Sequence, residues 1–204
     1  QHGKAPILMK TLPLLADMLS GNDLVTLRDK ALLFLGFAGA FRRSELVAVQ
    51  IEDLTFTTQG MVVFIPQSKG DQLGAGSEIA IPYAPQKEIC AVRAVRNWME
   101  AAGITSGPLF RGFKRNLQPR DTQLNDKAVA EIVKKYMARL GLDPSDFAGH
   151  SLRRGFATSA AQHDLNTLEI MRQTRHKSEK MVHRYIEQGN LFKENALDKM
   201  FNKK

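Results

Sequence analysis

The chain has 204 residues, enough for one large domain with a sizeable core, and carries a formal net charge of +8 with a pI near 9.7. That charge is typical of proteins that bind nucleic acid, although a protein that is merely basic fits it equally well. The single cysteine, Cys90, cannot form an internal disulfide, which favours a reducing compartment, and the lack of a long apolar run or signal-peptide pattern argues against membrane insertion and export.

The amino-terminal part is expected to contain one fully buried helix. Residues 1–22 are interpreted as a linker and a first helix. Thr26 and Asp29 form a pair typical of a capping box, and the apolar run 31–40 that follows leaves no polar face. We therefore predict a central, buried helix whose end delivers Arg42 to the edge of the core, where another short helix begins.

Residues 54–82 change character and predict a small antiparallel sheet. The runs 61–65 and 78–81 are rich in β-branched residues, and the connection between them contains three glycines. Residues 54–57 can add a third strand. Because helical patterns precede and follow this segment, the expected fold class is α+β, mainly α, with about three strands.

The second half of the chain is again predicted to be helical. Apolar residues recur at helical spacing from Ile89 to Ala102, whereas residues 105–123 are interpreted as a long loop. Without repeats or a convincing linker, residues 1–204 are predicted to form a single domain. Further helices are expected after Asn125 as a cap, from Ser151, from Asn166 with Glu169 completing its cap, from Ser178, and over residues 192–201.

Three segments carry residues suited to phosphate chemistry. Arg42 stands where a buried helix ends, and Glu45, one helical turn later, can hold its guanidinium for bidentate binding of phosphate. His150 and Arg153 lie on the same side of a predicted helix start, which attracts anions. Tyr185 lies on a short helix with an apolar face. Taken singly, each segment also fits an ordinary role: a surface ion pair, a solvated helix start or a packing tyrosine.

Together, these segments resemble the catalytic domain of the tyrosine recombinase, or phage integrase, family. The resemblance extends over about residues 24–190. It rests on four blocks in the order and spacing of the family: Arg-x-Ser-Glu-Leu at 42–46, Ser-Lys at 68–69, His-Ser-Leu-Arg-Arg-Gly at 150–155, and His-Lys-Ser at 176–178 followed by Tyr-Ile at 185–186. It implies the catalytic-domain fold of that family and an enzyme, a site-specific DNA strand transferase that acts through a 3′-phosphotyrosyl bond without metal, ATP or another cofactor.

The resemblance also implies roles for individual residues. The catalytic set would be Arg42, Lys69, His150, Arg153, His176 and Tyr185, with Glu45 in support. The two arginines would clamp the scissile phosphate, and Tyr185 would attack it. His150 would take part in proton transfer, Lys69 would protonate the 5′-hydroxyl leaving group, and His176 would hydrogen-bond a non-bridging oxygen.

Four neighbouring basic residues are candidates for contacts with the DNA backbone: Arg43, Arg154, Arg175 and Lys177. Two positions depart from the family pattern. Arg175 occupies the place of a glycine that usually precedes the histidine of the last block, and Gly70 stands where related sequences often have threonine. Neither departure removes a catalytic group.

The expected partner is double-stranded DNA. Members of this family usually carry an amino-terminal helical domain that completes a clamp around DNA, so the chain is interpreted as the catalytic part of a longer integrase. The full-length protein is expected to form a homo-tetramer on DNA, in the cytoplasm of a bacterium and associated with its nucleoid, and to be encoded by the host or a phage. The apolar stripe of the tail at 190–204 would dock on a neighbouring protomer or on its own domain.

Two alternatives share part of this pattern. A type IB topoisomerase-like enzyme uses similar chemistry, but the spacing of His150 and Arg153 favours a recombinase. A catalytically silent DNA-binding fragment would explain the charge but not the complete catalytic set. A metal hydrolase fits poorly, because the histidines show no His-Glu-x-x-His pattern and no carboxylate cluster accompanies them.

Overall fold

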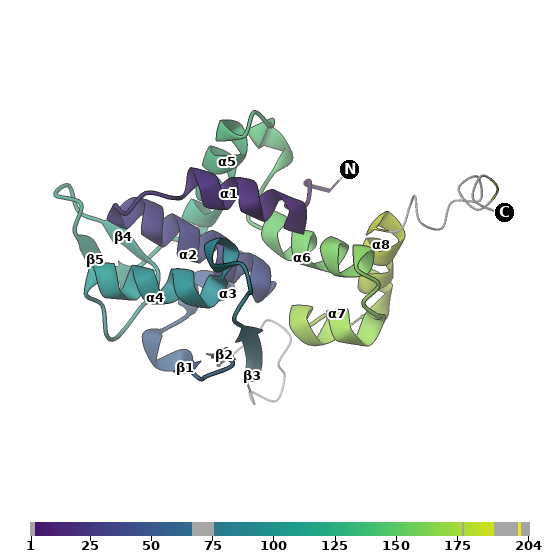
Figure 1. Ribbon diagram of the computed structural model, residues 1–204, viewed down its shortest axis with the longest axis horizontal. Helices are drawn as coiled ribbons and strands as arrows, with labels where there is room; N and C mark the ends of the chain where they lie inside the picture. Colours follow the sequence, from purple (N-terminus) through teal and green to yellow (C-terminus); the bar gives the residue numbers. More distant parts are fainter. Residues whose placement is uncertain (1–2, 67–75, 177, 190–199, 201–204) are drawn as a thin grey trace.

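The computed structural model describes residues 3–66, 76–176, 178–189 and 200. The hairpin β4–β5 lies at one end of the molecule and α7 and α8 at the other (Figure 1). In chain order, the helices are α1 (Leu12–Met18), α2 (Leu24–Ala38), α3 (Arg43–Ala48), α4 (Ala91–Ala102), α5 (Asp126–Arg139), α6 (Ser151–Gln162), α7 (Thr167–Thr174) and α8 (Glu179–Gly189), and the strands are β1 (Leu54–Phe56), β2 (Gly60–Ile65), β3 (Ser77–Pro82), β4 (Arg111–Phe113) and β5 (Pro119–Gln123). Single-turn 3-10 helices cover Met9–Thr11, Ile51–Asp53, Lys87–Ile89 and Pro144–Asp146.

Helix α2 forms the centre of the core, as its lack of a polar face predicts. Its residues 31–35 are at most 1% exposed, and the helix packs against α4 and α6. The predicted cap is wrong: Asp23 caps the helix by accepting a hydrogen bond from the Thr26 backbone N–H at 3.0 Å. Asp29 lies inside the helix, fully buried, where it accepts hydrogen bonds from the Arg28 guanidinium and the Tyr136 hydroxyl.

The predicted three-stranded antiparallel sheet is confirmed, with β2 between β1 and β3. Val62 pairs with Thr55 on one side and with Ala80 on the other. Met61, Val63 and Ile65 alternate along β2 and are buried, so one face of the sheet joins the core. Residues 67–75 of the β2–β3 connection, which include Lys69 and Gly70, lie outside the described residues.

A second hairpin replaces the loop that was predicted for residues 105–123, and that prediction is wrong. Strands β4 and β5 pair antiparallel, with Arg111 opposite Gln123. The side chains of β5 are largely exposed, so the strand shows no apolar alternation that a sequence pattern could reveal. The hairpin is attached by the Trp98 indole N–H, which donates to Leu109 O at 2.8 Å, and by the Arg28 guanidinium over the Phe113 ring.

The carboxyl-terminal helices begin where the sequence predicts. Asn125 caps α5 by accepting from the Lys127 N–H, and Asn166 and Glu169 form the predicted capping box of α7. Helices α6, α7 and α8 enclose a small core of their own, which comprises Ala157, Ala160, Ala161, Ile170 and Val182. The predicted helix over residues 192–201 lies largely outside the described residues. None of the helices in the described part of the chain has the length and apolarity needed to cross a membrane.

The amino-terminal segment before α1 crosses the surface of α6. The backbone N–H of Ala5 donates to Asp146 O at 2.7 Å, and that of Ile7 donates to Ser151 O at 3.0 Å. At the crossing, a Cβ added to Gly155 would lie 1.7 Å from Ile7 O. Glycine at this position therefore allows the segment to approach α6 closely, which places residues 3–8 beside the helix that carries Arg153.

Candidate active site

The turn between α2 and α3 positions Arg42. Ala40 in this turn has a positive φ of 45°, and Phe41 is buried. The Arg42 backbone N–H donates to Glu45 Oε2 at 2.9 Å, and its guanidinium forms an ion pair with Oε1. Burial alone would raise the pKa of Glu45, but hydrogen bonds from Arg42 and the charge of Arg175 outweigh it and lower that pKa. The carboxylate is thus ionised and holds Arg42 in place.

Arg153 reaches the same turn from α6. It is 5% exposed, and its Nη1 donates to Ala40 O at 2.8 Å. Its Nη2 has no hydrogen-bond partner among the described residues. Burial, followed by the charges of Arg42 and Arg175, lowers the pKa of Arg153, so its cationic form lacks full compensation within the protein. A buried guanidinium with a donor to spare suits an anionic ligand.

His150 stands at the N-terminus of α6, with its side chain exposed. Partial loss of hydration and then the charges of Arg43, Arg153 and Arg42 lower its pKa. The neutral imidazole is therefore the favoured form at neutral pH, and a neutral imidazole can accept a proton. The neighbouring Arg43 forms an ion pair of 3.0 Å with Asp126, at the start of α5.

The rings of His176 and Tyr185 lie close to each other. Their ring centroids are 5.7 Å apart and the rings are tilted by 38°. Tyr185 is partly buried against the small core between α6, α7 and α8, whereas His176 is 8% exposed. Burial, and then the charges of Arg153, Arg42 and Arg175, lower the pKa of His176 to about 4.

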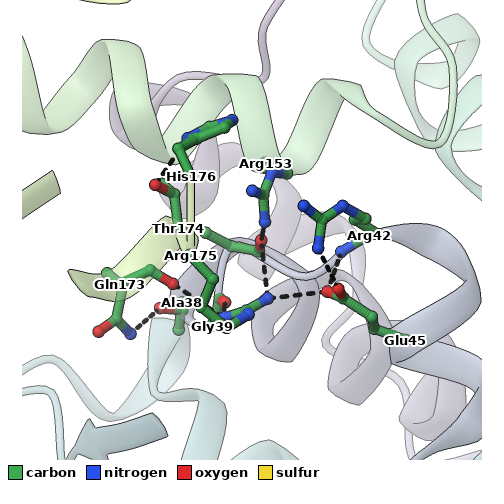
Figure 2. A network of polar contacts seen from close by, with 10 residues as sticks. Ala38, Gly39, Arg42, Glu45, Arg153, Gln173, Thr174, Arg175 and His176 are labelled. Carbon is green, nitrogen blue, oxygen red and sulfur yellow. Dashed lines mark hydrogen bonds and ion pairs between the residues drawn. The ribbon is translucent and has the colours of Figure 1, made fainter. Parts of the chain in front are cut away.

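Arg175 points into the protein and not towards solvent. Its guanidinium is directed into the protein, where it forms an ion pair of 2.8 Å with Glu45 Oε2 and donates to backbone carbonyl groups of the α2–α3 turn (Figure 2). Because the side chain is only 10% exposed, these internal contacts are a different use from the predicted contact with a DNA backbone. The sequence contains no local signal for this ion pair, because 130 residues separate its partners.

The other predicted residues fall into two groups. Arg154 is partly buried, with its guanidinium 6.0 Å from the centre of the Tyr185 ring. Lys69 and Lys177 lie outside the described residues, so their predicted roles stay predictions. The described members of the predicted catalytic set are brought together by α2–α3, α6 and α7–α8: Arg42, His150, Arg153, His176 and Tyr185.

The charge balance of the site favours an anion. Three guanidinium groups, from Arg42, Arg153 and Arg175, surround the single carboxylate of Glu45. The described residues contain no group of three or more histidine, cysteine or acidic side chains placed to hold a metal ion. The excess of positive charge suits an anionic ligand such as a phosphodiester, and a tyrosine hydroxyl is a group that can act as a nucleophile.

Comparisons with known proteins agree with this arrangement. The chain is 68% identical over 203 residues to an integrase/recombinase xerD homolog from Selenomonas ruminantium. The matched region covers 100% of this chain and 60% of the relative. It is 30% identical to tyrosine recombinase XerD from Xanthomonas axonopodis pv. citri, over 76% of the chain and 50% of the relative. The chain thus spans about half to three fifths of the length of these relatives.

Solved structures show the same fold. A XerH site-specific recombinase bound to palindromic difH substrate superposes with a TM-score of 0.73 at 16% identity, covering 97% of this chain and 52% of that one. The XerA recombinase gives a TM-score of 0.68 at 12% identity, covering 100% and 65% of the two chains. The sequence profile of the phage integrase family matches residues 10–190, and the chain therefore belongs to the phage integrase family.

Proposed function

We propose that this chain is the catalytic domain of a site-specific tyrosine recombinase, which cuts and rejoins DNA strands through a 3′-phosphotyrosyl intermediate without metal or ATP. One observation carries the proposal: segments far apart in the sequence place a tyrosine and two histidines beside guanidinium groups that lack full compensation. The names of the relatives, integrase/recombinase and tyrosine recombinase, support the same reaction class.

In this reaction the scissile phosphate binds between Arg42 and Arg153. Three guanidinium groups and one carboxylate give the site a formal charge of +2. A phosphodiester carries one negative charge, and the pentacoordinate transition state carries two. The fixed cations therefore stabilise the transition state more than the ground state, and removal of one such group typically lowers the rate by about 10²–10³-fold.

The bond changes balance within the site. The Tyr185 oxygen attacks phosphorus and forms the phosphotyrosyl bond, while the bond from phosphorus to the 5′-oxygen breaks. The phenol proton passes to neutral His150, and the departing 5′-oxygen takes a proton from Lys69 of the β2–β3 connection. Attack by the 5′-hydroxyl of another strand reverses these steps, so rejoining needs no further energy source.

The assembly and the cellular setting of the whole protein are also proposals. We propose that it clamps double-stranded DNA with an additional amino-terminal domain and works as a tetramer in the bacterial cytoplasm. An apolar pocket of about 220 Å³ beside α6 is a candidate binding site for the apolar tail that follows α8. It is lined by Met9, Phe37, Phe156, Ser159, Ala160, His163 and Leu165.

The nucleophile can be tested by trapping the covalent intermediate. The full-length protein is incubated with nicked suicide substrates made from the DNA that flanks its gene, and adducts are separated on denaturing gels. The wild-type protein should form an adduct at one position, and Tyr185→Phe should form none because the attacking oxygen is missing. Tyr83→Phe is the matched control and should retain the adduct. An adduct formed by Tyr185→Phe would contradict the assignment.

A supercoiled plasmid without a defined site separates the two related activities. Relaxation of this plasmid, together with failure to exchange strands between two marked sites, would favour a topoisomerase-like enzyme. Exchange between marked sites supports the recombinase.

A further inference from the structure

Arg175 ties together two turns that carry the catalytic groups. It follows α7, directly before His176, and its Nη1 donates to Gly39 O at 3.0 Å and to Gln173 O at 2.8 Å. Its Nη2 donates to Glu45 Oε2 at 2.8 Å and lies 3.4 Å from Ala40 O. Both terminal nitrogens of the guanidinium are therefore occupied, with one set of contacts on the α2–α3 turn and another on its own turn, whereas the buried Nε has no hydrogen-bond partner among the described residues.

The acceptors of Arg175 are shared with the arginines of the site. Glu45 binds Arg42 through Oε1 and Arg175 through Oε2, and Ala40 O also accepts from Arg153 at 2.8 Å (Figure 2). The orientation of Arg42 therefore depends on a carboxylate that Arg175 holds from the other side. Arg175 Nη2 also lies within hydrogen-bonding distance of Ala40 O, the carbonyl oxygen that accepts from Arg153.

The local chain does not favour this arrangement. Arg175 is the C-cap of α7 with φ 55° and ψ 38°, a left-handed conformation that is unfavourable for a residue other than glycine. Its guanidinium is nearly buried, and burial lowers its pKa against the opposing effect of Glu45. A glycine would adopt this left-handed turn without steric strain. The benefit of arginine at this position must therefore come from the contacts of its guanidinium.

We propose that Arg175 is a positioning residue for strand cleavage, which fixes the α2–α3 turn and its Arg42 relative to the turn that carries His176 and leads to Tyr185. It does not itself bind the scissile phosphate, because both terminal nitrogens donate within the protein and the remaining donor, Nε, is buried. This inference rests on the proposed function. It differs from a contact with the DNA backbone, for which removal of Arg175 would weaken DNA binding and leave the cleavage rate of the bound complex unchanged.

Arg175→Gly is the decisive variant, because glycine suits the left-handed turn while all guanidinium contacts are lost. We expect single-turnover cleavage of a suicide substrate to fall about tenfold to hundredfold, the range typical when a residue that orients catalytic groups is removed. The Kd for the substrate should change little, and cleavage is compared well below the midpoint of thermal unfolding, which loss of the buried ion pair with Glu45 is expected to lower. Arg175→Lys keeps the positive charge but loses the planar guanidinium that contacts two turns at once, and should recover only part of the rate. Arg172→Ala, which removes an exposed charge from the same helix, is the matched control and should cleave like the wild type.

A titration of His176 in the free protein gives a second readout that needs no DNA. Burial and the charges of Arg153 and Arg42 lower the pKa of His176 most, and the charge of Arg175 adds to them, so Arg175→Gly should raise this pKa by a small amount and Arg175→Lys should restore it. The pKa is followed by NMR of labelled histidine, with Arg175→Asn as a second variant that also tolerates the turn. Wild-type cleavage by Arg175→Gly overturns the proposal, and an unchanged titration would show that the Arg175 charge does not lie beside His176. Absence of any adduct with the wild-type protein would instead contradict the proposed function, and the titration would still decide the position of Arg175.

Discussion

At the scale of single residues, the tautomer of the neutral His176 ring is set by its neighbour Thr174. The Thr174 hydroxyl donates its only hydrogen to Ile170 O at 2.7 Å, and the same oxygen lies 2.7 Å from His176 Nδ1. It must therefore accept a hydrogen bond from Nδ1–H, which leaves Nε2 with the lone pair in the neutral ring. Donation from His176 to a phosphate oxygen, the role implied by the family resemblance, then requires Nε2 to gain a proton. The negative charge of bound phosphate favours this protonation.

The lowered pKa of His176 makes stability depend on pH. Burial and the neighbouring arginine charges lower its pKa to about 4 in the folded protein, against an ordinary value of 6.5, so the unfolded chain binds more protons between these values. Stability should therefore fall as the pH drops from about 6.5 towards 4, with about 2–3 kcal/mol lost at pH 4.5. Urea unfolding at pH 7 and pH 4.5 measures this loss. His176→Gln should show a correspondingly smaller loss, whereas His183→Gln, an exposed change on α8, should behave like the wild type. Equal losses in all three proteins would contradict the assigned pKa.

The residues of the site differ in how far the sequence predicts them. The pairing of Arg42 with Glu45 is local, since three positions in a helical turn place the two side chains together. The ion pair between Arg175 and Glu45 joins segments 130 positions apart, and no periodicity encodes such a contact. The motif pattern identifies which residues belong to the site. Only the fold reveals that an apparent surface arginine is a buried part of it.

At the scale of elements, local signals predict helices well and the polar hairpin poorly. Asn125 and Asn166 cap the helices that follow them, because capping is a contact over two or three residues. The hairpin β4–β5 depends on backbone pairing and on attachment to Trp98, which the residue pattern of β5 does not indicate. Likewise, the true cap of α2 is Asp23, and the predicted partner Asp29 serves a buried network with Tyr136.

The close approach of the amino-terminal segment to α6 gives a prediction for Gly155. In an ordinary helix, Gly→Ala is stabilising by up to about 1 kcal/mol. Here the new Cβ would meet the backbone carbonyl of Ile7, so we expect Gly155→Ala to be destabilising by about 1–3 kcal/mol. Chemical denaturation measures the change, and faster hydrogen exchange of the Ile7 amide should accompany it.

Gly112→Ala is the control for this experiment, because a Cβ there meets Arg120 only at an ordinary contact distance of 3.5 Å. A stabilised Gly155→Ala protein with unchanged exchange at Ile7 would show that the segment does not depend on the glycine.

At the scale of the whole molecule, the fold combines a large central core with a smaller one between α6, α7 and α8. Arg42 lies in the turn that follows the central helix α2, whereas His176 lies between α7 and α8 and Tyr185 lies on α8, and these two helices share a small core with α6. Helix α6 packs against both α2 and α8 and contributes Arg153 between them. The relative placement of the proposed phosphate-binding groups and the proposed nucleophile is therefore a tertiary property, which explains why these residues are scattered over the sequence.

The net charge of +8 predicts DNA binding that weakens steeply with salt, and the structure predicts which arginines contribute. The logarithm of the binding constant falls by about 0.9 per neutralised phosphate for each tenfold rise in salt. Arg42 is 29% exposed on its side chain and faces the proposed phosphate site, so Arg42→Gln should reduce the slope by about one contact. Arg175→Gly should change it by less than half as much, because its guanidinium already binds Glu45 and the turn. Fluorescence anisotropy with a short DNA duplex between about 50 and 200 mM salt measures the slopes. If Arg175→Gly reduced the slope as much as Arg42→Gln, Arg175 would be a phosphate contact, and the distinction between the two arginines would be lost.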